Sequence, residues 1–233
     1  MQNPPQQQPQ HIFSPFEQAL SDIRSQVIMM GSLVQRSLQN AQRGLFERDI
    51  SACGMAIADD EEIDALEIQN DRFGVEILTR FQPLASDMRQ VIAAMKVSNN
   101  LERIGDQVVT IARRALRLNN APPLAEVAWL EPMFRMASEM FSDSIRYYAD
   151  SSDQPARLMN QRDLLLDEKN RELTDRLADR MAQDVANLRS YLDLIFISRV
   201  LERIGDHSKN ICEDVVYICA AEDIRHQKIL KKI

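Results

Sequence analysis

Aromatic residues and glycine are scarce in this sequence. Aromatic side chains make up 6% of its 233 residues, one residue is tryptophan, and only 6 are glycine. The abundant residues are instead Ala, Leu, Arg, Gln, Glu and Met, which are good helix formers. This composition favours an all-α protein over one built from strands, in which aromatic and β-branched residues are enriched.

Signals for disulfides and for membrane segments are also missing. The three cysteines, Cys53, Cys212 and Cys219, are odd in number and form no CxxC pair, so we expect buried thiols in a reducing compartment. No uncharged apolar run approaches the length of about 18 residues typical of a transmembrane helix, so we expect no membrane insertion. The first residues contain neither a basic segment nor an apolar one. We therefore expect no signal peptide and a cytoplasmic protein.

Positive charge is in the minority. The 28 Lys and Arg residues face 35 Asp and Glu residues, which gives a formal net charge of −7. Nucleic-acid-binding proteins usually carry a basic surface, so we expect no nucleic-acid partner. An acidic surface can help to collect cations.

One hexapeptide, Leu-Glu-Arg-Ile-Gly-Asp, occurs twice, at residues 101–106 and 201–206. Further identities keep the same offset of 100 residues: Arg80 with Arg180, Arg89 with Arg189, and Ile111 with Ile211. Repeated identity at a fixed period is the signature of internal duplication. The sequence therefore predicts two similar halves.

The chain divides accordingly into four predicted segments. These are a disordered Gln- and Pro-rich tail at 1–13, a first three-helix repeat at 14–119, a second at 124–221, and a basic tail at 222–233. Apolar spacing and cap signals predict helices near residues 15–49, 51–81, 87–118, 125–150, 154–181 and 188–221. Helices this long need bundle partners. We therefore predict two tandem antiparallel three-helix bundles.

The repeated motif places like charges on one helical face. Glu102 and Asp106 are four residues apart, as are Glu202 and Asp206, and such a pair destabilises a helix by ~0.2–0.5 kcal/mol. A neighbouring Arg or a bound cation should therefore compensate. The glycine between the two acids costs ~1 kcal/mol in a helix, which indicates close packing or a ligand at that position.

The second and third predicted helices should bring further acids to this motif. In an antiparallel hairpin that turns at residues 83–84, Glu67 lies level with Glu102, and Asp60 or Asp64 lies level with Asp106. Two facing carboxylate pairs are the usual construction of metal sites in helix bundles, and hard cations prefer oxygen ligands. The alternative is a solvated acidic face with Arg or Lys partners.

Both copies of the motif, extended to residues 100–106 and 200–206, resemble the signature helices of the PhoU family of bacterial phosphate-uptake regulators. Residues 207–217 and 223–226 also resemble that family, and the resemblance spans about residues 16–228. It implies a homodimeric, non-enzymatic regulator that represses the phosphate-starvation response. The implied partners are a phosphate-specific ABC transporter ATPase and a phosphate-sensing histidine kinase.

The resemblance also implies a multinuclear, carboxylate-bound iron or zinc cluster in each repeat. Its ligands in the first repeat would be Glu67, Asp71, Glu102 and Asp106, and in the second Asp167, Glu202 and Asp206. The second repeat departs from the pattern, because Arg171 stands at the position of Asp71. Either Arg171 neutralises these acids directly, or it points outward and Asp163 or Asn170 fills the vacant position.

Two other functions fit parts of the sequence. One is a helical scaffold without metal, in which the acidic motif has no evident purpose. The other is a di-iron carboxylate enzyme, whose site needs Glu-x-x-His pairs. None of His11, His207 and His226 follows a glutamate by three residues, which counts against that enzyme.

Overall fold

The structure, a computed structural model, describes residues 14–225. The predicted tail at 1–13 and the last eight residues of the predicted basic tail lie outside the described residues. Six long helices make up most of the described chain: α1 (Pro15–Phe46), α2 (Ile50–Phe81), α3 (Ala85–Asn119), α4 (Glu131–Asp150), α6 (Met159–Gln183) and α7 (Leu188–Ala220). The predicted all-α architecture with six long helices is confirmed, and no strand occurs within residues 14–225.

The helix starts follow from short capping sequences. The Ser14 hydroxyl accepts a hydrogen bond from the Glu17 amide, while the Glu17 carboxylate accepts one from the Ser14 amide, so the capping box begins α1. The carboxylate of Asp49 accepts a bond of 2.9 Å from the Ala52 amide and caps α2. The third long helix begins at Ala85, two residues before the predicted start, and its N-cap residue Leu84 makes no side-chain hydrogen bond.

The predicted fourth and fifth helices are each divided. A 3₁₀ helix, η1 (Ala125–Leu130), precedes α4, and Pro132 lies in the first turn of α4, where its missing amide hydrogen leaves no helical bond unmade. The single turn α5 (Asp153–Ala156) precedes α6, and the short 3₁₀ helix η2 (Val185–Asn187) joins α6 to α7. These breaks shorten α4 and α6 relative to the helices of the first half.

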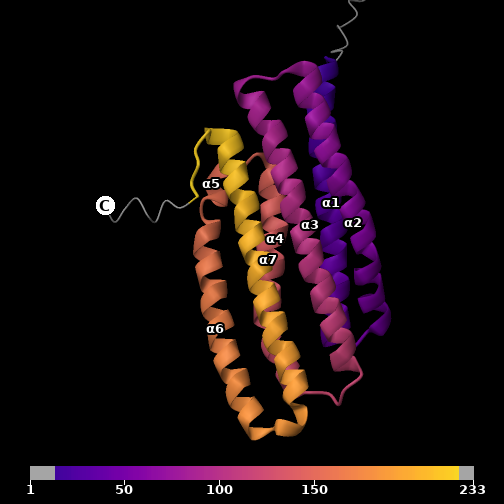
Figure 1. The fold of residues 1–233 in the computed structure, drawn as a ribbon. Helices are drawn as coiled ribbons and strands as arrows, with labels where there is room; N and C mark the ends of the chain where they lie inside the picture. The colour runs from indigo at the N-terminus through magenta and orange to yellow at the C-terminus, as the bar shows by residue number, and fades with distance from the viewer. Residues whose placement is uncertain (1–13, 226–233) are drawn as a thin grey trace, which may run out of the picture.

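Two bundles lie side by side, and α3 and α7 meet along their length between them (Figure 1). Helices α1, α2 and α3 pack on one another, and α7 packs on α4 and α6. Buried apolar side chains from all six long helices form one continuous core. No helix within residues 14–225 has the length and apolar character of a membrane-spanning segment.

Polar contacts also cross the seam between α3 and α7. The ammonium of Lys96 lies 3.5 Å from the carboxylate of Asp214, and Asn100 Oδ1 lies 3.0 Å from His207 Nδ1. Near the other end, Asp193 accepts hydrogen bonds from two arginines of α3, Arg114 at 2.7 Å and Arg117 at 2.6 Å. The two halves are therefore joined by specific hydrogen bonds as well as by the core.

The cysteines are only partly as expected. Cys53 and Cys212 are buried, but Cys219 is exposed, so the prediction of three buried thiols is wrong for Cys219. Cys219 lies in the last turn of α7, and its Sγ is 3.3 Å from the carbonyl oxygen of Ser151. The helix end leaves one side of this thiol open to solvent.

The motif glycines allow close packing of neighbouring helices. A Cβ on Gly105 would lie 3.2 Å from Cγ2 of Ile63 on α2, and one on Gly205 would lie 2.5 Å from Cδ2 of Leu166 on α6. Leu166 is fully buried and has little room to move. Close packing is therefore a sufficient reason for a glycine in the middle of α7.

This packing predicts opposite effects for two glycine substitutions. Gly205→Ala should lower the free energy of unfolding by about 1–2 kcal/mol, because overpacking outweighs the better helix propensity of alanine. Gly54 lies exposed within α2, and a Cβ there would meet no atom within 4 Å. Gly54→Ala should therefore raise the free energy of unfolding by about 1 kcal/mol. Urea unfolding measures both, and a Gly205→Ala protein as stable as wild type would contradict the packing argument.

Candidate functional site

The first acidic cluster lies between α2 and α3. Burial raises the pKa of Glu102, and the carboxylates of Asp106, Asp64 and Glu67 raise it further, against the opposing effect of Arg103. The Oε2 atom of Glu102 is buried and accepts no hydrogen bond from the protein. Four acids thus interact around the first copy of the motif, as the hairpin alignment predicts for Glu67 and Glu102.

Asp60 extends this cluster by one turn of α2. Burial raises its pKa, followed by the charges of Asp64 and Asp106, and its Oδ1 atom is also buried without a hydrogen bond. A Cβ on Gly105 would lie 3.7 Å from this oxygen, so the motif glycine adjoins the acids. Asp60 is therefore close enough to Asp106 to interact with it, and Asp64 interacts with both Asp60 and Glu102.

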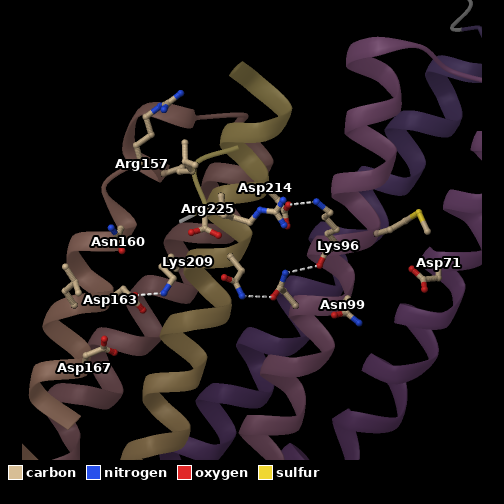
Figure 2. Close-up of a pocket in the computed structure, with 17 residues that line it drawn as sticks. Asp71, Lys96, Asn99, Arg157, Asn160, Asp163, Asp167, Lys209, Asp214 and Arg225 are labelled. Carbon is tan, nitrogen blue, oxygen red and sulfur yellow. Dashed lines mark hydrogen bonds and ion pairs between the residues drawn. The ribbon is translucent and has the colours of Figure 1, made fainter. Parts of the chain in front are cut away.

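Asp71 follows Glu67 by one turn of α2. It is exposed on α2 and borders a groove together with Met95 and Asn99 of α3, as Figure 2 shows for Asp71 and Asn99. The largest carboxylate contributions to the raised pKa of Glu102 come from Asp106, Asp64 and Glu67. We therefore define the first cluster by its five interacting acids, which are Asp60, Asp64, Glu67, Glu102 and Asp106.

The basic residue nearest the first cluster, Arg103, forms only exposed ion pairs with it. Arg103 Nε lies 3.3 Å from Glu102 Oε2, and Arg103 Nη1 lies 3.7 Å from Asp106 Oδ2. The Arg103 side chain is 53% exposed. Ion pairs of this kind contribute at most about 1 kcal/mol in water. The guanidinium can therefore move aside at little cost.

The second acidic cluster lies between α6 and α7 and contains Asp163, Asp167, Glu202 and Asp206. Burial raises the pKa of Glu202, and the charges of Asp206 and Asp167 raise it further. Asp163, which the sequence offered only as a substitute ligand, is the most buried of the four, with 6% of its side chain exposed. Burial is also the main reason that its pKa is raised.

A lysine neutralises part of this second cluster. Lys209 Nζ donates to Asp163 Oδ2 at 2.5 Å and to Asp206 Oδ1 at 3.0 Å, and the first bond is drawn in Figure 2. Burial alone would lower the pKa of Lys209, but hydrogen bonds to Asp163 and Asp206 outweigh burial and raise it. The ammonium therefore stays charged and ties α6 to α7.

Arg171 does not have the role predicted for an inward-pointing arginine. Its side chain is exposed, and no ion pair in the described part of the chain joins it to Asp167, Glu202 or Asp206. Asn170, the other substitute ligand, accepts a hydrogen bond of 2.9 Å from Ser198. The sequence reasoning missed Lys209, although its place three residues after Asp206 on one helix was a usable signal.

The first cluster is better suited to bind a metal ion than the second. Within residues 14–225, no three Asp, Glu, His or Cys side chains are placed to share one metal ion, so ligation would require the carboxylates to rotate. The first cluster offers only carboxylate oxygens, two of them without hydrogen bonds, which suits a divalent cation. In the second cluster, Asp163 and Asp206 already hold an ammonium.

A groove of about 1150 Å³ runs between α3 and the pair of α6 and α7 (Figure 2). Its walls mix charged and amide side chains, among them Lys96, Asn100, Arg157, Asp214 and Arg225. Burial raises the pKa of Asp214 to about 6, although the ammonium of Lys96 at 3.5 Å opposes this shift. The groove thus contains a carboxyl group that takes up a proton in mildly acidic solution.

Two stretches of the chain, residues 27–115 and 130–215, each match the family model of the PhoU domain. The chain belongs to the PhoU family. Its two matches fall one in each half, so the duplicated motif reflects two PhoU domains in tandem.

Relatives and solved structures agree with this assignment. The PhoU protein of Escherichia coli K12, named a phosphate-specific transport system accessory protein, is 31% identical over 93% of this chain and 90% of its own length. A homologue from Xylella fastidiosa is also 31% identical, over 92% of this chain and 90% of its own. The crystal structure of PhoU from Pseudomonas aeruginosa has a TM-score of 0.86 at 30% identity and covers 89% of this chain and 100% of that one.

The structure titled phosphate transport system regulatory protein PhoU, from Streptococcus pneumoniae, is less similar. It has a TM-score of 0.78 at 25% identity, over 90% of this chain and 99% of that one. PhoU proteins of two distant bacteria thus share the arrangement of helices described above.

The raised pKa of the Asp214 carboxyl group in the groove predicts that the free energy of unfolding depends on pH. Because the pKa of Asp214 is raised on folding, its contribution is fully present below the unfolded pKa of 3.8 and is lost as the pH rises through about 6. Asp214→Asn should therefore gain stability relative to wild type between about pH 4 and pH 7, by up to about 3 kcal/mol. Urea unfolding of both proteins across this range measures the difference.

A second substitution checks the cause of this dependence. Lys96 opposes the raised pKa of Asp214, so Lys96→Met should raise that pKa further, extend the loss of stability to higher pH and deepen it. Parallel pH profiles of wild type and Asp214→Asn would contradict the assignment to Asp214.

Proposed function

We propose that this PhoU protein is a negative regulator of phosphate uptake and of the phosphate-starvation response in the cytoplasm. It acts by protein–protein contact with the ATPase of a phosphate-specific ABC transporter and with a phosphate-sensing histidine kinase. The observation that carries the proposal is the similarity, over about nine-tenths of the chain, to proteins named as accessory and regulatory proteins of phosphate transport. The long helical faces of the two bundles offer the contact surfaces, and the working form is a homodimer.

We also propose that the first cluster binds iron or zinc. Glu67, Glu102 and Asp106 are the central ligands, with Asp60 and Asp64 of the same cluster completing the set. Asp71, which the family resemblance adds, would have to reach over from the neighbouring turn of α2. When bound, a metal ion would supply positive charge in addition to that of the exposed Arg103. The chain's own part is to hold carboxylates on both α2 and α3, so that a shared cation links the two helices.

The regulatory role predicts a phenotype in the host organism. Deleting the gene should derepress a phosphate-starvation reporter in phosphate-rich medium, because the contact that keeps the kinase in its repressing state is lost. A wild-type copy should restore repression, while a copy truncated before α7 should not, since α7 carries most of the contacts of the second half. Reporter activity that stays low after deletion would contradict the proposed role.

The metal proposal predicts a loss of binding from two substitutions in the first cluster. The double variant Glu102→Gln and Asp106→Asn keeps the size of both side chains but removes their charge. It should bind Fe²⁺ or Zn²⁺ at least about tenfold more weakly than wild type, since even indirect partners of metal ligands have effects of that size. Elemental analysis after loading, with the purified full-length chain, measures the metal-to-protein ratio.

An exposed acid pair provides the matched control. Glu168 and Glu172 have the same four-residue spacing on α6, and both are exposed, so Glu168→Gln with Glu172→Gln should leave metal binding unchanged. Equal metal content in the motif variant, the control and wild type would show that the first cluster is not the site. That result would favour the metal-free scaffold.

A further inference from the structure

The duplication lets the two clusters serve as comparisons for each other. Three acids of the first cluster keep an acid at the position 100 residues later: Glu67 with Asp167, Glu102 with Glu202, and Asp106 with Asp206. The motif glycine is kept, and so is a hydrogen bond one helical turn before the motif glutamate. Asn70 donates to Ser98 at 2.9 Å in the first half, and Ser198 donates to Asn170 at 2.9 Å in the second. The frame around the acids is therefore common to both halves.

Two positions beside these acids differ together. In the first half they are Ile63 and Val109, which are 1% and 5% exposed and belong to the apolar interior. In the second half they are Asp163 and Lys209, which form the ion pair at 2.5 Å. An apolar pair in one half thus corresponds to a carboxylate and an ammonium in the other.

Lys209 makes the connections that a bridging cation would make. Its ammonium binds Asp163 on α6 and Asp206 on α7, so it links two helices through carboxylate oxygens. Its side chain is only 21% exposed, in contrast to Arg103 in the first half. An ammonium has three donors and no acceptor, so it competes with a metal ion for the same oxygens.

The second cluster has a carboxylate oxygen that the ammonium leaves unsatisfied. Asp163, with 6% of its side chain exposed, has one oxygen, Oδ1, that is buried and accepts no hydrogen bond. The carboxylates of Asp167 and Asp206 are close enough to act on Asp163 electrostatically. Without Lys209, the buried carboxyl group of Asp163 would have no hydrogen-bonding cation, and the remaining positive charges near the cluster would be Arg199 and Arg203, which act on Glu202.

We infer that Lys209 is a built-in cation that takes the place of a metal ion in the second cluster. The two copies of the PhoU motif then differ in kind: the first accepts an exchangeable metal, and the second carries its own positive charge. This inference refines the proposed metal binding and rests on it only for the role of the first cluster.

The test uses the full-length chain with the first cluster disabled by Glu102→Gln and Asp106→Asn. After removal of metals with a chelator, this background should show no rise in Tm on addition of zinc chloride. Adding Lys209→Met should lower the Tm without zinc, because the buried acids lose their partner. Zinc should then raise it by about 5 °C, and calorimetric titration should show zinc binding that the background lacks.

Three further variants serve as controls or alternatives for this experiment. Lys209→Arg keeps a positive charge and should not respond to zinc. Arg171→Asp restores the acid that the family resemblance leads one to expect, but should gain no zinc binding, because Arg171 is exposed and does not pair with the cluster. If Lys209→Met does not fold, Asp163→Ile with Lys209→Val imports the residue pair of the first half and should fold and bind zinc through the remaining acids.

Several outcomes would overturn the inference. One is zinc binding to the second cluster while Lys209 is present, and another is no zinc binding in either Lys209→Met or the imported pair. A gain of zinc in Arg171→Asp alone would assign the block to Arg171 instead. Because the first cluster is already disabled, none of these results depends on whether that cluster binds metal. The metal proposal fails separately if wild type and the Glu102→Gln, Asp106→Asn protein bind equal amounts.

Discussion

Carboxylates gathered between two packed helices must find positive charge, and this requirement organises both halves of the molecule. Glu102 and Glu202 each lie in the middle of a long helix, where burial raises the pKa of the carboxyl group. Gly105 and Gly205, which follow these glutamates, allow α2 to pack closely on α3 and α6 to pack closely on α7. The acids therefore cannot become fully hydrated by separation of the helices. The same close packing that stabilises each hairpin therefore creates the repulsion within it.

In the two halves, the basic residues that pair with the carboxylates are held with different strength. Lys209 is held by two carboxylates and is shielded from solvent, whereas Arg103 is exposed and is easily displaced. A hairpin neutralised by its own lysine keeps the same stability whatever the metal supply. A hairpin that relies on a metal becomes more rigid when the metal is present. Since α3 belongs to the first hairpin and also packs along α7, such a change would reach the seam between the halves.

Much of the fold follows from spacing along the chain. Two copies of one motif, six long apolar patterns and the capping box at Ser14 predict an all-α duplication, and the height of each acid along its helix predicts that Glu67 faces Glu102. Spacing does not fix the rotation of a helix within a few tens of degrees. Arg171 is only about 40° around α6 from Asp167, yet that turn is enough to place it in solvent. That Lys209 pairs with Asp163 and Asp206 depends on the reach of its flexible side chain, which cannot be predicted from periodicity in the sequence.

Comparing the halves distinguishes residues required for helix packing from residues that determine the charge of each acidic cluster. Gly105 and Gly205, and the Asn–Ser hydrogen bonds one turn before the motif glutamates, occur in both halves because each helix pair must pack closely whatever it binds. The positions of Ile63 and Val109, both buried in the first half, are taken in the second half by the ion pair of Asp163 and Lys209. A buried lysine with no carboxylate would be costly, as would a buried aspartate with no cation, so these two positions can change only together. Their joint difference therefore exchanges two apolar residues for an ion pair within a frame that the two halves share.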